Sequence, residues 1–495
     1  MRRACCALLV LLSAQPALGA DLCVKSGGSD ATAKGSIVYV AGNEAGSTCW
    51  ATVGRAVWGQ ATRTTTPGVA AAVAGDTVYV FGATYGNTTA SVDDEEFDVL
   101  YNPVNEGGAS TPIILYALAA VTLTSTSWTG PVIGTFGKDY IHWTGPWTLN
   151  DANISLQPET GSIVVYGSTG SKIDGAIVTG TTQAWVTNYN GVRLEQAIDP
   201  IIRNVTCTGI HLNPDGHNAA CLMLYDTNGA LVEYNNFSAS NAGIYEKGAH
   251  GVGFPDQERN VFRGNKLFDL ASAVVITASD DAEYTQNILY GNAGYNFKIN
   301  TLGGGPNNLT VANNTIHGGD NTCIVYNGAP TAGWTNVRYY NNICSAARIG
   351  TGSEDFAAID ANSATGFHEH NVYHGLTDVG SDDIAHFGVN EYSLAEWNGL
   401  GQDAAAPASI TSDPLFTNAA GRDYTLGALS PARSLGVDIA DLDSDANASE
   451  CTHAGAHQTG SEVFGVGGSG AGVLTCAAAS SGTTRLRLTP GEDDE

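Results

Sequence analysis

Short apolar runs recur along the chain with Asn and Gly between them, and one arrangement repeats as a motif. The motif consists, in order, of an apolar residue, any two residues, an Asn, any one residue, and an apolar or small residue. It occurs in seven segments. The clear copies are "VEYNNF", "FRGNKL", "YTQNIL", "VANNTI" and "YYNNIC", and the weaker copies are "IIRNVT" and "HEHNVY". Their asparagines, in chain order, are Asn204, Asn235, Asn265, Asn287, Asn314, Asn342 and Asn371. Successive asparagines are 31, 30, 22, 27, 28 and 29 residues apart, as expected for the coils of a solenoid with loops of variable length.

The asparagine of each motif has a physical role in such a coil. A tight turn between two short strands leaves backbone groups facing inward, and an Asn side chain can hydrogen-bond to them. Asn side chains on successive coils would lie about 4.8 Å apart, which lets them hydrogen-bond to one another. The sequence therefore predicts an all-β fold, a parallel β-solenoid in which an Asn ladder joins each coil to the next.

A further strand follows about nine or ten residues after each ladder Asn. The segments are "AGIYEKG", "AVVITAS", "YNFKIN", "TCIVYN" and, after a longer loop, "FAAIDAN". The strand period of two predicts one inward apolar set, namely Ile244, Val275, Phe297, Ile324 and Ile359. The same period predicts an outer face with Tyr245 and Lys247, onto which stack Ile276, Lys298, Val325 and Asp360. A slip of one residue would invert this assignment.

The N-terminal part of the chain predicts a cap on the solenoid. The segment "CWATVGRAVWG" places Val53, Ala56 and Val57 at helical spacing, so we expect a short amphipathic helix that covers the open end of the hydrophobic stack. The segments "AGDTVYVFGATYG", "TPIILYALAA" and "DYIHWTGPW" follow and are typical of early coil strands.

The first residues and the cysteines predict an exported protein. Met1-Arg2-Arg3, an apolar run from Ala4 to Ser13 and the small residues of "PALGAD" are typical of a signal peptide, which we place at residues 1–20. Eight cysteines follow, and an even number in an exported chain indicates disulfides. The simplest of many connectivities pairs Cys23 with Cys49, Cys207 with Cys221, Cys323 with Cys344, and Cys451 with Cys476. Zinc is not expected, because the chain has no Cys-x-x-Cys pair.

The net charge of −28 limits the partners. Such a surface repels nucleic acid and anionic membranes, and no later segment reaches the roughly 20 apolar residues of a transmembrane helix. We expect a monomer that is secreted or periplasmic. The charge has two interpretations: it serves solubility, or its Asp-rich loops bind calcium through oxygen ligands.

The repeats, the N-terminal segments and a closing stretch that begins "EYSLAEWNGLGQD" at Glu391 together resemble the right-handed parallel β-helix superfamily of secreted bacterial proteins. That superfamily includes pectate lyases, alginate lyases and chondroitinase B. The resemblance implies one β-helix domain over residues 21–460 with an N-terminal cap. Residues 461–495 are small, polar and finally acidic, and we expect a tail with little core.

The resemblance also implies candidate chemistry. In alginate lyases of the chondroitinase B family, the base is a lysine at the end of an outer strand shortly after a ladder Asn, which is the position of Lys247. The arginine that the family places one coil onward has no counterpart in "VVITASDD", and Lys298, Arg259 and Arg263 are candidates to replace it. Cleavage by elimination needs a neutralised carboxylate, a base for the C5 proton and a proton donor for the leaving oxygen.

The remaining site candidates each have a plainer alternative. Asp280 and Asp281 are candidate calcium ligands, and an ordinary acidic turn is the alternative. Tyr245 is a candidate for lining the substrate groove, whereas Lys247 itself could simply be a solvated lysine that begins a turn.

The sequence favours a polysaccharide-active protein, and a lyase acting on a uronate-containing chain is the leading hypothesis. The alternatives are a non-catalytic, adhesive glycan-binding β-helix and a glycoside hydrolase of the same fold, in which two carboxylates act as acid and base.

Overall fold

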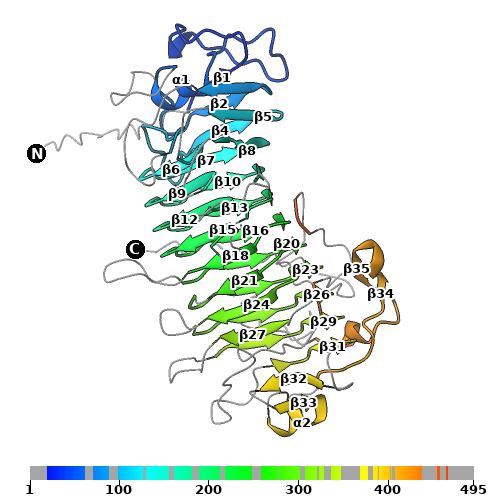
Figure 1. Cartoon of the computed structure of the whole chain (residues 1–495). Coiled ribbons are helices and arrows are strands. Elements are labelled where there is room, and N and C mark those ends of the chain that lie inside the picture. The colour runs from blue at the N-terminus through cyan, green and yellow to red at the C-terminus, as the bar shows by residue number, and fades with distance from the viewer. Residues whose placement is uncertain are drawn as a thin grey trace, which may run out of the picture.

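The computed structural model describes residues 19–61, 71–87, 99–125, 130–154, 161–180, 189–211, 218–247, 258–277, 279–300, 307–319, 323–327, 336–346, 368–376, 383–387, 390–401, 403, 407–436, 454–456 and 464–466. Three parallel sheets run side by side along one elongated stack, as Figure 1 shows. From Ile113 to Asn327 the chain passes through each sheet in turn before it begins the next coil, and this order confirms the predicted parallel β-solenoid.

The strands of the three sheets are short and stack in chain order. Sheet A contains β1 (Asp21–Val24), β2 (Thr77–Val80), β4 (Ile113–Ala117), β7 (Ile141–Thr144), β10 (Lys172–Asp174), β13 (Ile201–Arg203), β16 (Leu231–Glu233), β19 (Val261–Arg263), β22 (Glu283–Thr285), β25 (Thr310–Ala312), β28 (Arg338–Tyr340) and β30 (His368–Glu369). Sheet B contains β3 (Thr84–Asn87), β5 (Val121–Ser125), β8 (Trp147–Ile154), β11 (Ile177–Thr179), β14 (Thr206–Thr208), β17 (Asn236–Ser238), β20 (Lys266–Phe268), β23 (Ile288–Tyr290), β26 (Thr315–His317), β29 (Ile343–Ser345) and β31 (Val372–His374). Sheet C contains β6 (Ile133–Phe136), β9 (Ile163–Tyr166), β12 (Val192–Glu195), β15 (Ala220–Tyr225), β18 (Ala242–Glu246), β21 (Ala273–Thr277), β24 (Tyr295–Asn300) and β27 (Ile324–Asn327).

A ladder of buried Asn side chains lies between sheets A and B and confirms the role predicted for the motif. The amide Nδ2 of each member donates to the Oδ1 of the member one coil on, over 2.9 Å from Asn235 and 3.3 Å from Asn342. The series runs through Asn235, Asn265, Asn287, Asn314, Asn342 and Asn371. The residue before each ladder position has a left-handed backbone, for example φ 55° at Asn313 and 54° at Asn341, which explains the Asn-Asn pairs in "VANNTI" and "YYNNIC".

Asn204 is the one motif asparagine that the ladder does not contain. The ladder position of its coil is Val205, whose backbone N–H donates to Asn235 Oδ1 over 2.8 Å. Asn204 itself takes the left-handed turn position, with φ 53°, and its amide donates to Asp174 Oδ1 over 2.8 Å. In this coil the motif therefore placed the ladder position one residue too early, because Asn suits both positions of this turn.

The inward apolar stack forms one core along the axis, and the predicted strand alternation is confirmed where the structure describes it. Ile244, Val275, Phe297 and Ile324 follow one another in register across sheet C and belong to this core. Ile359, predicted to point inward, and Asp360, predicted to point outward, lie outside the described residues.

The N-terminal end of the stack carries the predicted cap. Helix α1 (Val53–Trp58) begins at Thr52, whose hydroxyl accepts a hydrogen bond from the Arg55 N–H, and it ends at Gly59 in the left-handed conformation. Its apolar side, which includes Val53 and Val57, packs on the core. The helix therefore shields the first coil from water.

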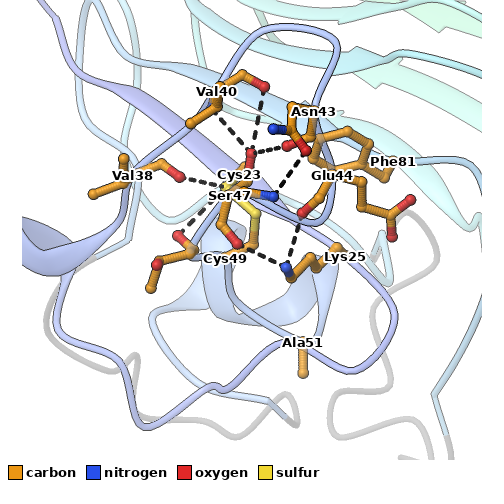
Figure 2. Close-up of a disulfide and its surroundings, with 12 residues drawn as sticks. Cys23, Lys25, Val38, Val40, Asn43, Glu44, Ser47, Cys49, Ala51 and Phe81 are labelled. Atoms are coloured by element: carbon orange, nitrogen blue, oxygen red, sulfur yellow. Dashed lines mark hydrogen bonds between the residues drawn. A yellow bond between two sulfur atoms is a disulfide. The ribbon is translucent and has the colours of Figure 1, made fainter.

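Disulfides join three of the four predicted cysteine pairs, and Cys451 and Cys476 lie outside the described residues. Figure 2 shows the first, Cys23 with Cys49, which fixes a loop against the outer face of β1. Within that loop, Lys25 Nζ donates to the Ser47 carbonyl over 2.7 Å, and the Ser47 hydroxyl donates to the Asn43 carbonyl over 2.7 Å. The loop therefore closes the N-terminal edge of sheet A.

Two hairpins and several short helices complete the C-terminal part and the loops. They are β32 (Asp383–Phe387) with β33 (Asn390–Ser393), β34 (Phe416–Asn418) with β35 (Asp423–Leu426), α2 (Leu394–Gly399), and the 3-10 turns at Lys34–Ser36, Ala419–Gly421 and Pro431–Ser434. Tyr424 packs on the outer face of sheet B against Tyr290, together with Phe464. Phe464, in the segment expected to be a tail, is thus buried. No helix among the described residues is long and apolar enough to cross a membrane.

Candidate functional site

The outer face of sheet C carries the residues that the sequence placed there. Met223, Tyr245, Ile276 and Lys298 follow one another in register on β15, β18, β21 and β24. Tyr245 packs with Met223 in a cluster separate from the core, which confirms that its side chain points outward. Burial raises the pKa of Tyr245 above its usual value, and the neighbouring Tyr225 raises it further.

Lys247 follows the last residue of β18 and reaches back toward the preceding coil. Its backbone N–H donates to the Leu224 carbonyl over 2.9 Å, which extends the pairing of β18 with β15 by one residue. Its Nζ donates to the Tyr225 hydroxyl over 3.3 Å and to Asn218 Oδ1 over 3.4 Å. These contacts hold the amine against a phenol on the outer face of the solenoid.

Tyr225 lies between two cationic side chains from neighbouring coils. The Arg193 guanidinium carbon is 4.4 Å from the centre of the Tyr225 ring, and Lys247 Nζ is 5.3 Å from it. Arg193 also pairs with Glu195, with Nη2 to Oε2 at 2.6 Å. We call Arg193, Glu195, Asn218, Tyr225 and Lys247 the Lys247 cluster.

The electrostatics of the Lys247 cluster disfavour the protonated form of its amine. Partial burial lowers the pKa of Lys247, and the positive charge of Arg193 lowers it further. With one arginine, one lysine and one glutamate, the cluster has a formal charge of +1 when Lys247 is protonated. It is therefore a local positive site on a chain whose net charge is −28.

Sequence reasoning missed Arg193, Tyr225 and Asn218. Arg193 and Tyr225 lie on outward positions of "VRLE" and "CLMLY", so strand alternation could have placed them on the face of Tyr245. The coil that contains β15 has Val205 in place of a ladder Asn, so no motif marks where its outward positions begin. Asn218 precedes β15 in a connection that has no repeating pattern.

Lys298 lies on the same outer face as Tyr245, two strands further along the stack, a separation of roughly 9.5 Å at ordinary strand spacing. It is largely buried, and its Nζ is 5.1 Å from the centre of the Tyr295 ring. Lys247 and Lys298 therefore occupy separate positions along one face.

The two candidate arginines lie elsewhere in the coil. Arg263 is on the outer face of sheet A, where its Nε donates to Glu233 Oε2 over 2.9 Å. Arg259 is in the corner that leads from sheet C to sheet A, and its Nη2 donates to Asn228 Oδ1 over 2.6 Å. The structure thus assigns Arg263 to a different sheet from Lys247.

Asp280 and Asp281 occupy the same corner one coil further on. Asp280 Oδ1 accepts a hydrogen bond from the Asn307 backbone N–H over 2.7 Å, and Asp281 Oδ1 accepts one from Asn308 Nδ2 over 2.7 Å. Across the described ranges, no three His, Cys, Asp or Glu side chains are grouped to hold a metal ion. The contacts are typical of an acidic turn, and calcium binding by this pair stays a prediction.

Two tryptophans and a histidine whose side chains could in principle bind a ligand belong to the core instead. Trp143 and Trp147 are fully buried and meet edge to face with ring centres 5.0 Å apart. His368 is buried in the last described coil of sheet A, where its ring meets Tyr339 and Trp397 at 5.2 Å and 5.7 Å. Burial lowers the pKa of His368 to about 3, so it is a neutral packing residue at physiological pH.

A match to a family model supports the fold. Residues 141–316, which include the Lys247 cluster and Lys298, match the family model described as the right handed beta helix region. A rhamnogalacturonan lyase structure is 12% identical, with 71% of this chain and 87% of that chain covered and a TM-score of 0.35. The structure of XylC with xylose is 10% identical, with 80% and 87% covered and a TM-score of 0.37.

A PL6 family polysaccharide lyase from Pseudopedobacter saltans is 10% identical, with 55% of this chain and 81% of that chain covered and a TM-score of 0.21. At the level of sequence, none of the curated proteins compared matches this chain. The family match, together with the three-sheet topology, establishes a right-handed parallel β-helix.

Proposed function

We propose that this right-handed parallel β-helix acts on polysaccharides, and that it cleaves a uronate-containing chain by β-elimination at the Lys247 cluster. The observation that carries the proposal is the pairing of Lys247 Nζ with the Tyr225 hydroxyl over 3.3 Å, beside Arg193. An amine with a lowered pKa, a phenol and a guanidinium meet the three needs of this reaction, namely a base, a proton donor and a positive charge.

The chemical step uses both members of the pair on one side of the sugar ring. Neutral Lys247 removes the proton from C5, the electrons of the C5–H bond form the C4=C5 double bond, and the C4–O bond breaks. The leaving oxygen takes the proton of the Tyr225 hydroxyl. The ammonium of Lys247 then returns a proton to the tyrosinate over the same 3.3 Å contact, which restores both groups.

The charges around the pair have distinct roles in this proposal. Arg193 stabilises the substrate carboxylate as negative charge develops at C5, and Glu195 holds the guanidinium in place through their 2.6 Å contact. Lys298 would contact a sugar further along the chain, because it lies two strands onward on the same face. The three disulfides fit work outside the reducing cytosol.

The test is to incubate the protein with pectate, alginate, chondroitin and neutral glycans, with and without calcium. We expect ultraviolet absorbance from the C4=C5 bond on at least one uronate polymer, and a loss of roughly a hundredfold or more in Lys247→Met. Lys172→Met is the matched control, because Lys172 pairs with Asp174 on the outer face of sheet A.

Two other results would each contradict the proposal. New reducing ends without the absorbance would indicate hydrolysis by carboxylates. Binding to a glycan in a pull-down with no product on any polymer would indicate the non-catalytic protein.

A further inference from the structure

Directly before Lys247 in the chain, a carboxylate points into the solenoid. Glu246 has no solvent-exposed surface, and it pairs in register with the core residue Leu224. Consecutive strand residues point to opposite faces, so Glu246 faces inward where Lys247 faces outward. The two residues are joined by one peptide bond, and their side chains lie on opposite faces of sheet C.

Glu246 accepts hydrogen bonds from three buried donors. Asn260 Nδ2 and the Ser279 hydroxyl donate to its Oε1 over 2.9 Å and 2.7 Å, and the Tyr284 hydroxyl donates to its Oε2. Both oxygens of the Glu246 carboxyl group are therefore hydrogen-bonded inside the solenoid.

The three donors come from segments that the chain visits after it leaves β18. Asn260 lies where the chain returns to sheet A, just before β19, and Ser279 lies in the equivalent corner of the next coil. Tyr284 is on β22, where its ring stacks on Phe262 with centres 4.4 Å apart. The carboxylate thus ties the end of β18 to both corners and to sheet A.

The Asn260 contact has a particular geometric effect. Glu246 is the last residue before Lys247, and Asn260 is the first ladder-like Asn after the chain returns, because its Oδ1 accepts the Ala230 N–H over 2.9 Å. The bond between them therefore fixes both ends of the connection that begins at Lys247. Burying a carboxyl group is costly unless its hydrogen bonds are made, so the three contacts constrain where the end of β18 can lie.

We propose that Glu246 is a positioning residue for Lys247. It fixes the backbone from which Lys247 reaches the Tyr225 hydroxyl, without itself touching substrate. The inference has two tests. The test by enzyme kinetics rests on the proposed function, whereas the test by chemical labelling of Lys247 does not.

The test compares Glu246→Gln with Ile244→Val. Glutamine has nearly the shape of glutamate but presents an N–H group to the donors that surround Glu246. Ile244→Val makes a core side chain on the same strand one carbon smaller. Assays run well below the melting temperature of both variants. We expect Glu246→Gln to lower kcat by roughly tenfold to a hundredfold with little change in KM, because small misplacements of a catalytic group are costly. Ile244→Val should keep its kcat even though its melting temperature falls.

A second measurement needs no substrate. The rate at which an acylating reagent labels Lys247 is followed by peptide mass spectrometry, with Lys172 as internal reference. A changed ratio in Glu246→Gln supports the positioning role, even if the wild-type protein cleaves no polymer. An unchanged labelling ratio of Lys247 to Lys172 in Glu246→Gln would show that Glu246 serves core stability alone. A Glu246→Gln variant with a lower melting temperature but the wild-type kcat would show the same.

Discussion

Replacing Asn287 with alanine should strongly weaken the stack, because this side chain joins three coils. Its Oδ1 accepts from the Asn265 backbone N–H over 3.1 Å and from Asn265 Nδ2 over 3.0 Å. Its Nδ2 donates to the Phe262 carbonyl and to Asn314 Oδ1, both over 3.0 Å. Alanine removes all four bonds and leaves their buried polar partners without them.

The expected loss follows from these four contacts. At roughly 1 kcal/mol for each buried hydrogen bond, Asn287→Ala should lower the free energy of unfolding by about 4 kcal/mol. Asn308→Gly is the control, because Asn308 also bonds to amide and carboxylate neighbours but lies on the surface. Glycine accepts its φ of 54° without strain, so the control should change stability by less than about 1 kcal/mol.

Urea unfolding followed by circular dichroism measures both variants, and hydrogen exchange locates the change. Because each coil contacts only its neighbours, lost protection should centre on β19, β22 and β25. Equal stability of Asn287→Ala and Asn308→Gly would refute the claim that the buried ladder joins the coils.

Three further predictions concern titration and catalysis. Lys247→Met should lower the rate at which the C4=C5 double bond of the product forms by roughly a hundredfold or more, whereas Lys172→Met should leave that rate unchanged; ultraviolet absorbance measures both. Arg193→Gln should raise the pKa of Lys247, since Arg193 lowers it; the rising limb of activity against pH should then move to higher pH, and an unmoved limb would contradict the role of Lys247 as base. His368 has a pKa of about 3 when folded and 6.5 ordinarily, so the unfolded chain binds more protons between these values. Acidification from pH 6.5 should therefore cost roughly 1.4 kcal/mol per unit through this group, and chemical unfolding at several pH values should show a shallower slope in His368→Phe.

The fold was predictable because one turn repeats with few exceptions. Each turn has a residue with a left-handed backbone followed by a buried Asn, and this preference depends only on neighbouring residues. The spacing of these turns along the sequence therefore reveals the coils. The alternation of Ile244 and Tyr245 was equally local. Asn204 shows the limit, because a neighbouring Asn at the left-handed position imitates the ladder residue.

The site was less predictable because its members come from different coils. Lys247 was found from its place at a strand end, but its contact with Tyr225 depends on the register between β15 and β18. Arg263 was expected near the groove and lies on sheet A, since the length of the connection after β18 hides where the next strand begins. The alternation that turns Tyr245 and Lys247 outward also turns Glu246 inward, but only the fold shows that Asn260, Ser279 and Tyr284 meet its carboxyl group.

The turn between sheets A and B always spans two residues in the coils with a ladder Asn, from β16 to β17 as from β28 to β29. The return from sheet C to sheet A instead takes 14 residues between β18 and β19 and five between β21 and β22. In the same coils the connections from sheet B to sheet C vary less, from three residues between β17 and β18 to six between β26 and β27. Most of the length variation thus lies at one edge of the molecule, the edge where Lys247 leaves its strand. Segments can be grafted, lengthened or exchanged there while the stack keeps its pitch, so the molecule offers a rigid frame on which the rim of a binding surface can be redesigned coil by coil.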